Sequence, residues 1–140
     1  MKTLKQHLRI LIIEDSPDRQ KILQQLFKDH AWILVHTAER AVRLLSVYDF
    51  DLIALDFDLA TEKTGEDVAQ FIAQSRNKNA KVIIHSMNHP GAVKITEILP
   101  DADIVPISKI TRDNATFKRL REELTKGVDI NWKTVFGGGH

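Results

Sequence analysis

The chain has 140 residues, of which 43% are hydrophobic and 28% are charged, which suits one compact domain with a real core and leaves no room for a second. Its 20 basic and 19 acidic residues give a net charge of +1 and are spread along the chain, so we expect no direct nucleic-acid partner. The absence of cysteine excludes disulfides, thiolate metal sites and cysteine nucleophiles. No apolar run is long enough to span a bilayer, and we expect no membrane contact and a cytoplasmic location.

Short apolar runs of strand size alternate with helical patterns up to about residue 126. The runs cover residues 8–13, 32–35, 52–55, 82–84 and 104–107. Apolar side chains recur at helical spacing between them, in stripes at residues 22–27, 41–48, 68–72 and 117–124, and we expect a further helix over 91–99. Proline at positions 17 and 90 marks two helix starts, and Gly127 follows the last helical pattern.

This alternation predicts an α/β fold, in which right-handed βαβ units build a parallel sheet covered on both faces. The expected architecture is a flavodoxin-like (βα)₅ doubly wound sheet with strand order 2-1-3-4-5. Pro106 lies in the last apolar run and has no amide hydrogen, so we place that strand at a sheet edge. We expect one domain over residues 1–127 and a C-terminal tail over 128–140.

Acidic and polar side chains follow the predicted strands at their carboxyl ends, where doubly wound sheets bind ligands. They are Glu14 and Asp15 after the first strand, Asp56 and Asp58 after the third, His85 and Ser86 after the fourth, and Lys109 beyond the fifth. Carboxylates that converge on one crevice repel one another unless a hard cation neutralises them, and oxygen ligands of this kind suit Mg²⁺. A carboxylate can also accept a phosphoryl group, whose oxygens Lys109 and the Ser86 hydroxyl could contact.

Two segments resemble the receiver domain of two-component response regulators. ILIIEDSPDR is similar to the first strand and acidic pair of that family, and LIALDFD to its third strand. The resemblance covers about residues 8–126. It implies that Asp56 is the phosphoacceptor and that Mg²⁺ is held by Glu14, Asp15 and Asp56, with the backbone carbonyl of Asp58 as a further ligand.

The segment VIIHS resembles the fourth strand of receivers, which implies that Ser86 is the switch hydroxyl and that Lys109 reaches the phosphoryl group. The usual Met-Pro after the acceptor is absent, replaced by LATEKTGEDVA, and two positions near Lys109 also depart from the family. Pro106 stands where receivers usually have an aromatic switch residue, and Ile110 stands where they have a proline after the lysine. These departures leave the phosphorylation chemistry intact but put the usual serine-to-aromatic switch in question.

The pieces LDFDLA, TGEDVAQFI and IIHSMNHPGA resemble a smaller branch, the cyclic-phosphate-processing receivers. That branch carries histidine between the two aspartates, where this chain has Phe57. Two other histidines, His85 and His89, lie four residues apart around the predicted strand-4 loop. We interpret them as a packed or solvated pair rather than as metal ligands, because no helix places them on one face.

The resemblance implies a free-standing receiver that accepts a phosphoryl group on Asp56 in a Mg²⁺-dependent phosphorelay, with self-phosphorylation and dephosphorylation as its only chemistry. A sensor histidine kinase or a phosphotransfer protein would supply the phosphoryl group, and an unknown downstream effector protein would bind the phosphorylated form. The sequence leaves open whether the protein forms a homodimer. One alternative is a phosphohydrolase, either cyclic-phosphate-processing or of the haloacid-dehalogenase type. Residues 56–61 resemble the nucleophile motif of the haloacid-dehalogenase type. Another is an unphosphorylated pseudo-receiver that serves as a docking module.

Overall fold

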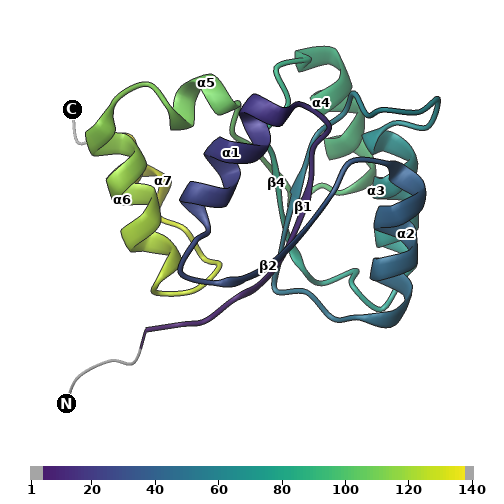
Figure 1. Cartoon of the computed structure of the whole chain (residues 1–140), viewed down its shortest axis with the longest axis horizontal. Coiled ribbons are helices and arrows are strands. Elements are labelled where there is room, and N and C mark those ends of the chain that lie inside the picture. Colours follow the sequence, from purple (N-terminus) through teal and green to yellow (C-terminus); the bar gives the residue numbers. More distant parts are fainter. Residues whose placement is uncertain (1–4, 138–140) are drawn as a thin grey trace.

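A computed structural model of the chain describes residues 5–137 and contains one five-stranded parallel sheet (Figure 1). Its order is β2-β1-β3-β4-β5, which confirms the expected flavodoxin-like topology and places the fifth strand at an edge. The strands are β1 (Arg9–Ile13), β2 (Ala31–Val35), β3 (Leu52–Leu55), β4 (Lys81–Ile84) and β5 (Asp103–Ile104).

Helices cover both faces of the sheet, as Figure 1 shows. Successive strand residues point to opposite faces, so Leu11 and Ile13 belong to one hydrophobic cluster while Ile10 and Ile12 belong to the other. On the first face lie α2 (Ala38–Val47), α3 (Gly65–Ala73) and α4 (His89–Ile98). On the second lie α1 (Pro17–Leu26), α5 (Ile107–Ile110), α6 (Asn114–Leu124) and α7 (Trp132–Val135). Within residues 5–137, no helix has both the length and the apolar character needed to cross a membrane.

Side-chain caps begin three helices next to the carboxyl ends of the strands. Ser16 caps α1, which starts at Pro17 as predicted, and Asn88 caps α4, in which Pro90 is the second residue. Thr64 forms a capping box with Asp67 at the start of α3. These caps satisfy helix amides that would otherwise lack partners, and they hold the first turns of α1, α3 and α4 beside the end of the sheet.

The fifth strand is shorter than the apolar run 104–107 predicts. Regular pairing ends at Ile104, although the amides of Val105 and Ile107 still donate to the carbonyls of Ile84 and His85 at 2.8 and 3.0 Å. Pro106 has no amide to donate and directly precedes α5, so the chain turns into a helix at Ile107. This early turn decides where the following residues, including Lys109, lie.

The part of the tail that the structure describes packs back on the domain. Val135 is buried, and the indole Nε1 of Trp132 donates to Asp103 Oδ2 at 2.8 Å. The rings of Trp132 and Phe136 stack with centroids 5.7 Å apart. The chain enters this segment through Gly127, whose φ of +127° favours glycine. The expected boundary between the domain and the tail at residue 127 stays a prediction. Residues 1–4 of the expected domain and residues 138–140 of the expected tail lie outside the described residues.

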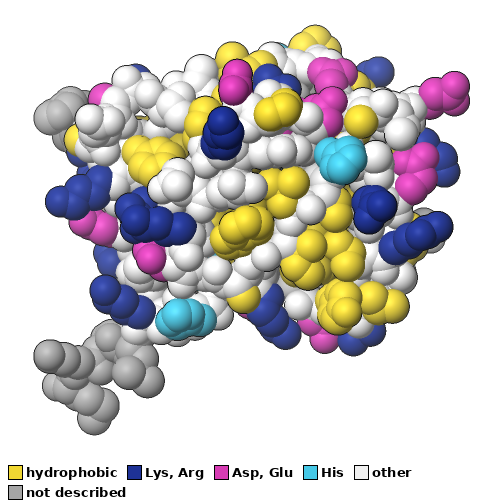
Figure 2. Space-filling model, in the orientation of Figure 1, with side chains coloured by type: hydrophobic (Ala, Val, Ile, Leu, Met, Phe, Trp, Pro, Cys, Tyr) yellow, Lys and Arg dark blue, Asp and Glu magenta, His cyan; other side chains and the backbone are white. Residues whose placement is uncertain are grey.

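Figure 2 shows the outer surface in the same orientation, with apolar side chains gathered on the face over β2. Trp32 and Ile33 of β2 are exposed, as are Val47 and Tyr48 at the end of α2. Lysines, arginines and acidic residues are interspersed around this apolar area. The visible face therefore has no basic stripe of the kind that binds a phosphate backbone.

Candidate functional site

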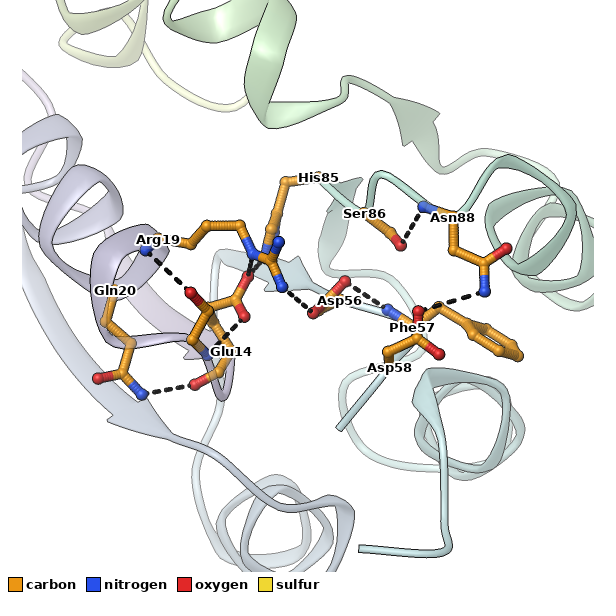
Figure 3. Close-up of polar contacts among 10 residues, drawn as sticks. Glu14, Arg19, Gln20, Asp56, Phe57, Asp58, His85, Ser86 and Asn88 are labelled. Carbon is orange, nitrogen blue, oxygen red and sulfur yellow. Dashed lines mark hydrogen bonds and ion pairs between the residues drawn. The ribbon is translucent and has the colours of Figure 1, made fainter. Parts of the chain in front are cut away.

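Three side chains meet at the carboxyl ends of three adjacent strands because the strand register aligns them. Ile13 of β1 pairs with Leu55 of β3, and Leu55 pairs with Ile84 of β4. The next residue of each strand is therefore at the same level of the sheet: these are Glu14, Asp56 and His85 (Figure 3). All three are buried, with at most 2% of Asp56 exposed. The structure therefore brings polar side chains from these three strand ends together.

Glu14 is held as a carboxylate by three donors. Its Oε1 accepts from Arg19 Nε at 3.0 Å and lies 2.9 Å from His85 Nε2, and its Oε2 accepts from the Ser16 amide at 2.9 Å. Burial by itself raises the pKa of Glu14, but the hydrogen bonds from His85, Ser16 and Arg19 outweigh it and lower that pKa to about 2. An ionised carboxylate can only accept, so the His85 proton that faces it lies on Nε2.

Asp56 has one engaged oxygen and one free oxygen. Its Oδ1 accepts from the Phe57 amide at 2.9 Å, whereas Oδ2 is buried and accepts no hydrogen bond from the described residues. The nearest cation to Oδ2 is Arg19, whose Nη2 is 3.7 Å away. Burial and the charge of Glu14 raise the pKa of Asp56 to about 6. This carboxylate is poorly compensated, which leaves Oδ2 ready to bind a cation or a reacting group.

Three other predicted site residues, Asp15, Ser86 and Asp58, differ in their burial and in their contacts. Asp15 is half-buried next to Glu14, and burial together with the Glu14 charge raises its pKa. Ser86 is buried, and its Oγ accepts from the Asn88 amide at 3.0 Å. Asp58 is exposed, and its carboxylate accepts from Asn88 Nδ2 at 3.2 Å (Figure 3). The strand-3 and strand-4 ends are thus linked through Asn88.

Lys109 is a predicted site residue that, within residues 5–137, forms no ion pair with Asp56. It lies on α5, is exposed, and its Nζ is 5.1 Å from the centroid of the Phe136 ring. Lys109 is on a helix because α5 starts directly after Pro106, and this helix places its ammonium next to Phe136 of the tail. The expected contact of Lys109 with a phosphoryl group stays a prediction.

Two residues of the site were missed by the sequence argument. Arg19 follows the cap Ser16 by three residues, so its place in the first turn of a helix that begins at a strand end was a usable signal. His85 was interpreted as packed or solvated, and it is packed, but against the Glu14 carboxylate; His89 is exposed at the start of α4. The ligand atoms of Glu14, Asp56 and His85 lie within 4.8 Å of one another, so these residues could together hold a metal ion.

Two glycines bring helices against the loop after β3. A Cβ on Gly65 would overlap the backbone carbonyl oxygen of Asp56, and the Gly65 amide donates to the Phe57 carbonyl at 2.7 Å. A Cβ on Gly91 would overlap the Phe57 ring. Gly65 therefore lets α3 lie against the Asp56–Phe57 backbone, and Gly91 lets α4 lie against the Phe57 ring, which explains why small residues stand at these helix starts.

A known protein family matches most of the residues that build the sheet and the site. The family described as the cyclic-phosphate processing receiver domain matches residues 9–101, which is more than half of the chain. The chain belongs to this family. The matched region includes β1 to β4 and every buried residue of the site, and it ends before β5 and Lys109 of this receiver. No curated protein sequence matches the chain.

Three solved response regulators have the same fold. The phosphorylated cyanobacterial phytochrome response regulator RcpA aligns with a TM-score of 0.68 and 19% identity, over 84% of this receiver and 91% of that chain. The Mn²⁺-bound response regulator Rcp1 aligns at 0.64 and 23% identity, over 82% and 90%. TrrA from Thermotoga maritima, in complex with Mg²⁺ and BeF, aligns at 0.62 and 22% identity, over 80% and 97%. At these identities the likeness shows the fold alone.

Proposed function

We propose that this receiver accepts a phosphoryl group on Asp56 in a Mg²⁺-dependent phosphorelay. The observation that carries the proposal is Oδ2 of Asp56, which is buried at the end of the central strand β3 and accepts no hydrogen bond from residues 5–137, with the Arg19 guanidinium 3.7 Å away. A carboxylate oxygen without a partner is available as a nucleophile. The raised pKa of Asp56, about 6, still leaves most of the group ionised at neutral pH.

The donor set fits a hard divalent cation. Glu14 and Asp56 present oxygens within 4.8 Å of each other, and Asp15 adds a half-buried carboxylate beside them. We propose that Glu14, Asp15 and Asp56 hold Mg²⁺, with the backbone carbonyl of Asp58 as a further ligand. When bound, the ion would neutralise these carboxylates and the charge of a transferring phosphoryl group. TrrA in complex with Mg²⁺ and BeF and the Mn²⁺-bound Rcp1 have this fold, which supports the proposal.

Ser86 has the second role in this proposal. Its hydroxyl accepts from the Asn88 amide, so its own proton stays free to donate to a phosphoryl oxygen. The phosphoryl donor would be a sensor histidine kinase or a phosphotransfer protein, and a separate effector would bind the phosphorylated form. A cytoplasmic location and the option of a homodimer belong to the same proposal.

A phosphohydrolase is the second candidate, because the family description names cyclic-phosphate processing and because His85 is buried beside Glu14. A hydrolase of the haloacid-dehalogenase type would also need Asp58 as its general acid. Asp58 is exposed, and Asn88 holds its carboxylate. A pseudo-receiver would not need the unpartnered Oδ2 of Asp56. We therefore place phosphoacceptor chemistry first.

The experiment incubates wild type, Asp56→Asn and Asp58→Asn with acetyl phosphate, with Mg²⁺ or with EDTA, and reads the added phosphoryl mass on the intact protein. Labelling of wild type and Asp58→Asn in Mg²⁺ only, and none of Asp56→Asn, is the expected result. Undiminished labelling of Asp56→Asn would overturn the assignment. Steady turnover of a cyclic nucleotide phosphate that Asp58→Asn or His85→Leu abolishes would instead favour the hydrolase.

A further inference from the structure

The positive charge nearest to Asp56 comes from α1. Arg19 Nε donates to Glu14 Oε1 at 3.0 Å, and Nη2 of the same guanidinium lies 3.7 Å from Asp56 Oδ2 (Figure 3). The Arg19 backbone is held by the Ser16 cap. With 33% of its side chain exposed, Arg19 lies between the buried carboxylates and solvent. Glu14 thus holds the guanidinium through Nε, and Nη2 beside it on the same edge faces the free oxygen of Asp56.

Lys109, the cation expected for this role, has a different neighbourhood. Its ammonium lies over the Phe136 ring, which stacks on Trp132. The indole of Trp132 in turn donates a hydrogen bond to Asp103. A cation over an aromatic face is stabilised by roughly 0.5–1 kcal/mol at an exposed site. At the carboxyl end of β4, the residue of the β5 segment that bonds to His85 is Ile107. Lys109 lies two residues further, on α5.

We propose that Arg19, rather than Lys109, supplies the fixed positive charge that stabilises phosphoryl transfer to Asp56. The inference rests on the proposed phosphoacceptor function. In the step, Asp56 Oδ2 forms a bond to the phosphorus of the donor while the bond from phosphorus to the donor's leaving atom breaks. With acetyl phosphate, acetate leaves with that electron pair, and no oxidant or reductant is needed. Arg19 stabilises the phosphoryl oxygens because a planar guanidinium matches their geometry.

The test compares the rate of labelling by acetyl phosphate in saturating Mg²⁺ for wild type, Arg19→Gln, Arg19→Lys and Lys109→Gln. Loss of one preorganised cation or donor at a transition state slows a reaction by roughly 100-fold or more. We expect that loss for Arg19→Gln and a change within about 2-fold for Lys109→Gln, since its contact is with Phe136. Arg19→Lys should recover part of the rate, because an ammonium keeps the charge but cannot contact Glu14 and the phosphoryl group together.

Lys21→Gln is the matched control, because it removes the same charge from an exposed position on the same helix. Far-ultraviolet circular dichroism and the thermal midpoint check that each variant is folded; if Arg19→Gln is not, the Arg19→Lys and Lys109→Gln pair decides. Slow labelling of Lys109→Gln beside normal labelling of both Arg19 variants would overturn the inference and leave the proposed function standing. Equal slowing of Arg19→Gln and Lys109→Gln would overturn it too. No labelling of wild type from acetyl phosphate or a kinase would remove the proposed function and this inference together.

Discussion

The imidazole of His85 and the carboxylate of Glu14 form a fully buried pair, with Nε2 2.9 Å from Oε1. The two residues are 71 positions apart in the chain and join the ends of β1 and β4 across β3. The Glu14 carboxylate also accepts from the Ser16 amide and from Arg19 Nε at the start of α1. The Glu14 carboxylate therefore links the carboxyl ends of the strands to the first helix and to Arg19, the cation that faces Asp56.

Replacing His85 with leucine should destabilise the protein by about 2–4 kcal/mol, because a buried charge loses a donor while the side-chain volume is roughly kept. The measurement is the free energy of unfolding in urea, with EDTA present. His89→Leu is the control at an exposed position and should stay within about 0.5 kcal/mol of wild type. An unchanged midpoint for His85→Leu would mean that Arg19 and Ser16 alone hold Glu14.

Neutralising Asp56 should stabilise the metal-free protein above pH 6. Burial and the Glu14 charge raise the folded-state pKa of Asp56 from 3.8 to about 6, so the folded state binds this proton more tightly than the unfolded state. The contribution of Asp56 to stability is therefore fully present below pH 4 and is lost as the pH rises to about 6. At pH 8, Asp56→Asn should unfold with a free energy about 1–3 kcal/mol above wild type.

The same comparison at pH 4 should show a much smaller difference, since Asp56 is then largely protonated in wild type. Urea unfolding in EDTA at both pH values measures it, with Asp58→Asn as the control for a nearby exposed carboxylate. A stabilisation of Asp56→Asn that does not depend on pH would contradict the electrostatic explanation.

Mg²⁺ affinity should fall at least about tenfold in Asp15→Asn, because the change removes a hard anionic ligand from the proposed site while keeping the side-chain shape. Isothermal titration calorimetry with MgCl₂ measures the affinity. Asp18→Asn, also acidic but exposed in the first turn of α1, should bind as wild type does. Equal affinities for Asp15→Asn and wild type would show that the ligand set is wrong.

The two glycines beside Asp56 should differ in their response to alanine. Gly65→Ala places a Cβ against the Asp56 backbone, which cannot move without shifting the site, and should cost more than about 3 kcal/mol. Gly91→Ala meets the Phe57 side chain, which can rotate, and should cost about 1–3 kcal/mol. The double variant Gly91→Ala, Phe57→Ala should show a non-additive recovery in urea unfolding, whereas purely additive losses would exclude the Phe57 contact as the cause.

Much of the fold could be predicted from the sequence because it depends on local patterns and on the geometry of parallel sheets. Apolar runs such as 52–55 identify strands without any partner, and Ser16 with Pro17 marks a helix start by backbone chemistry alone. Once the strands are parallel, their carboxyl ends share one edge, so Glu14 and Asp56 had to be neighbours. The serine and the carboxylates of the candidate site were within reach of that argument.

Only the tertiary structure decided which cation faces Asp56. Pro106 indicated an edge strand, but in the fold the chain turns into α5 directly after it, and Lys109 on that helix lies over the Phe136 ring of the tail. Arg19 and His85 acquire their roles through Glu14, whose partners come from separate segments. A side chain takes the partner that best compensates its burial and charge, and that competition is settled among groups that become neighbours only when the chain is folded.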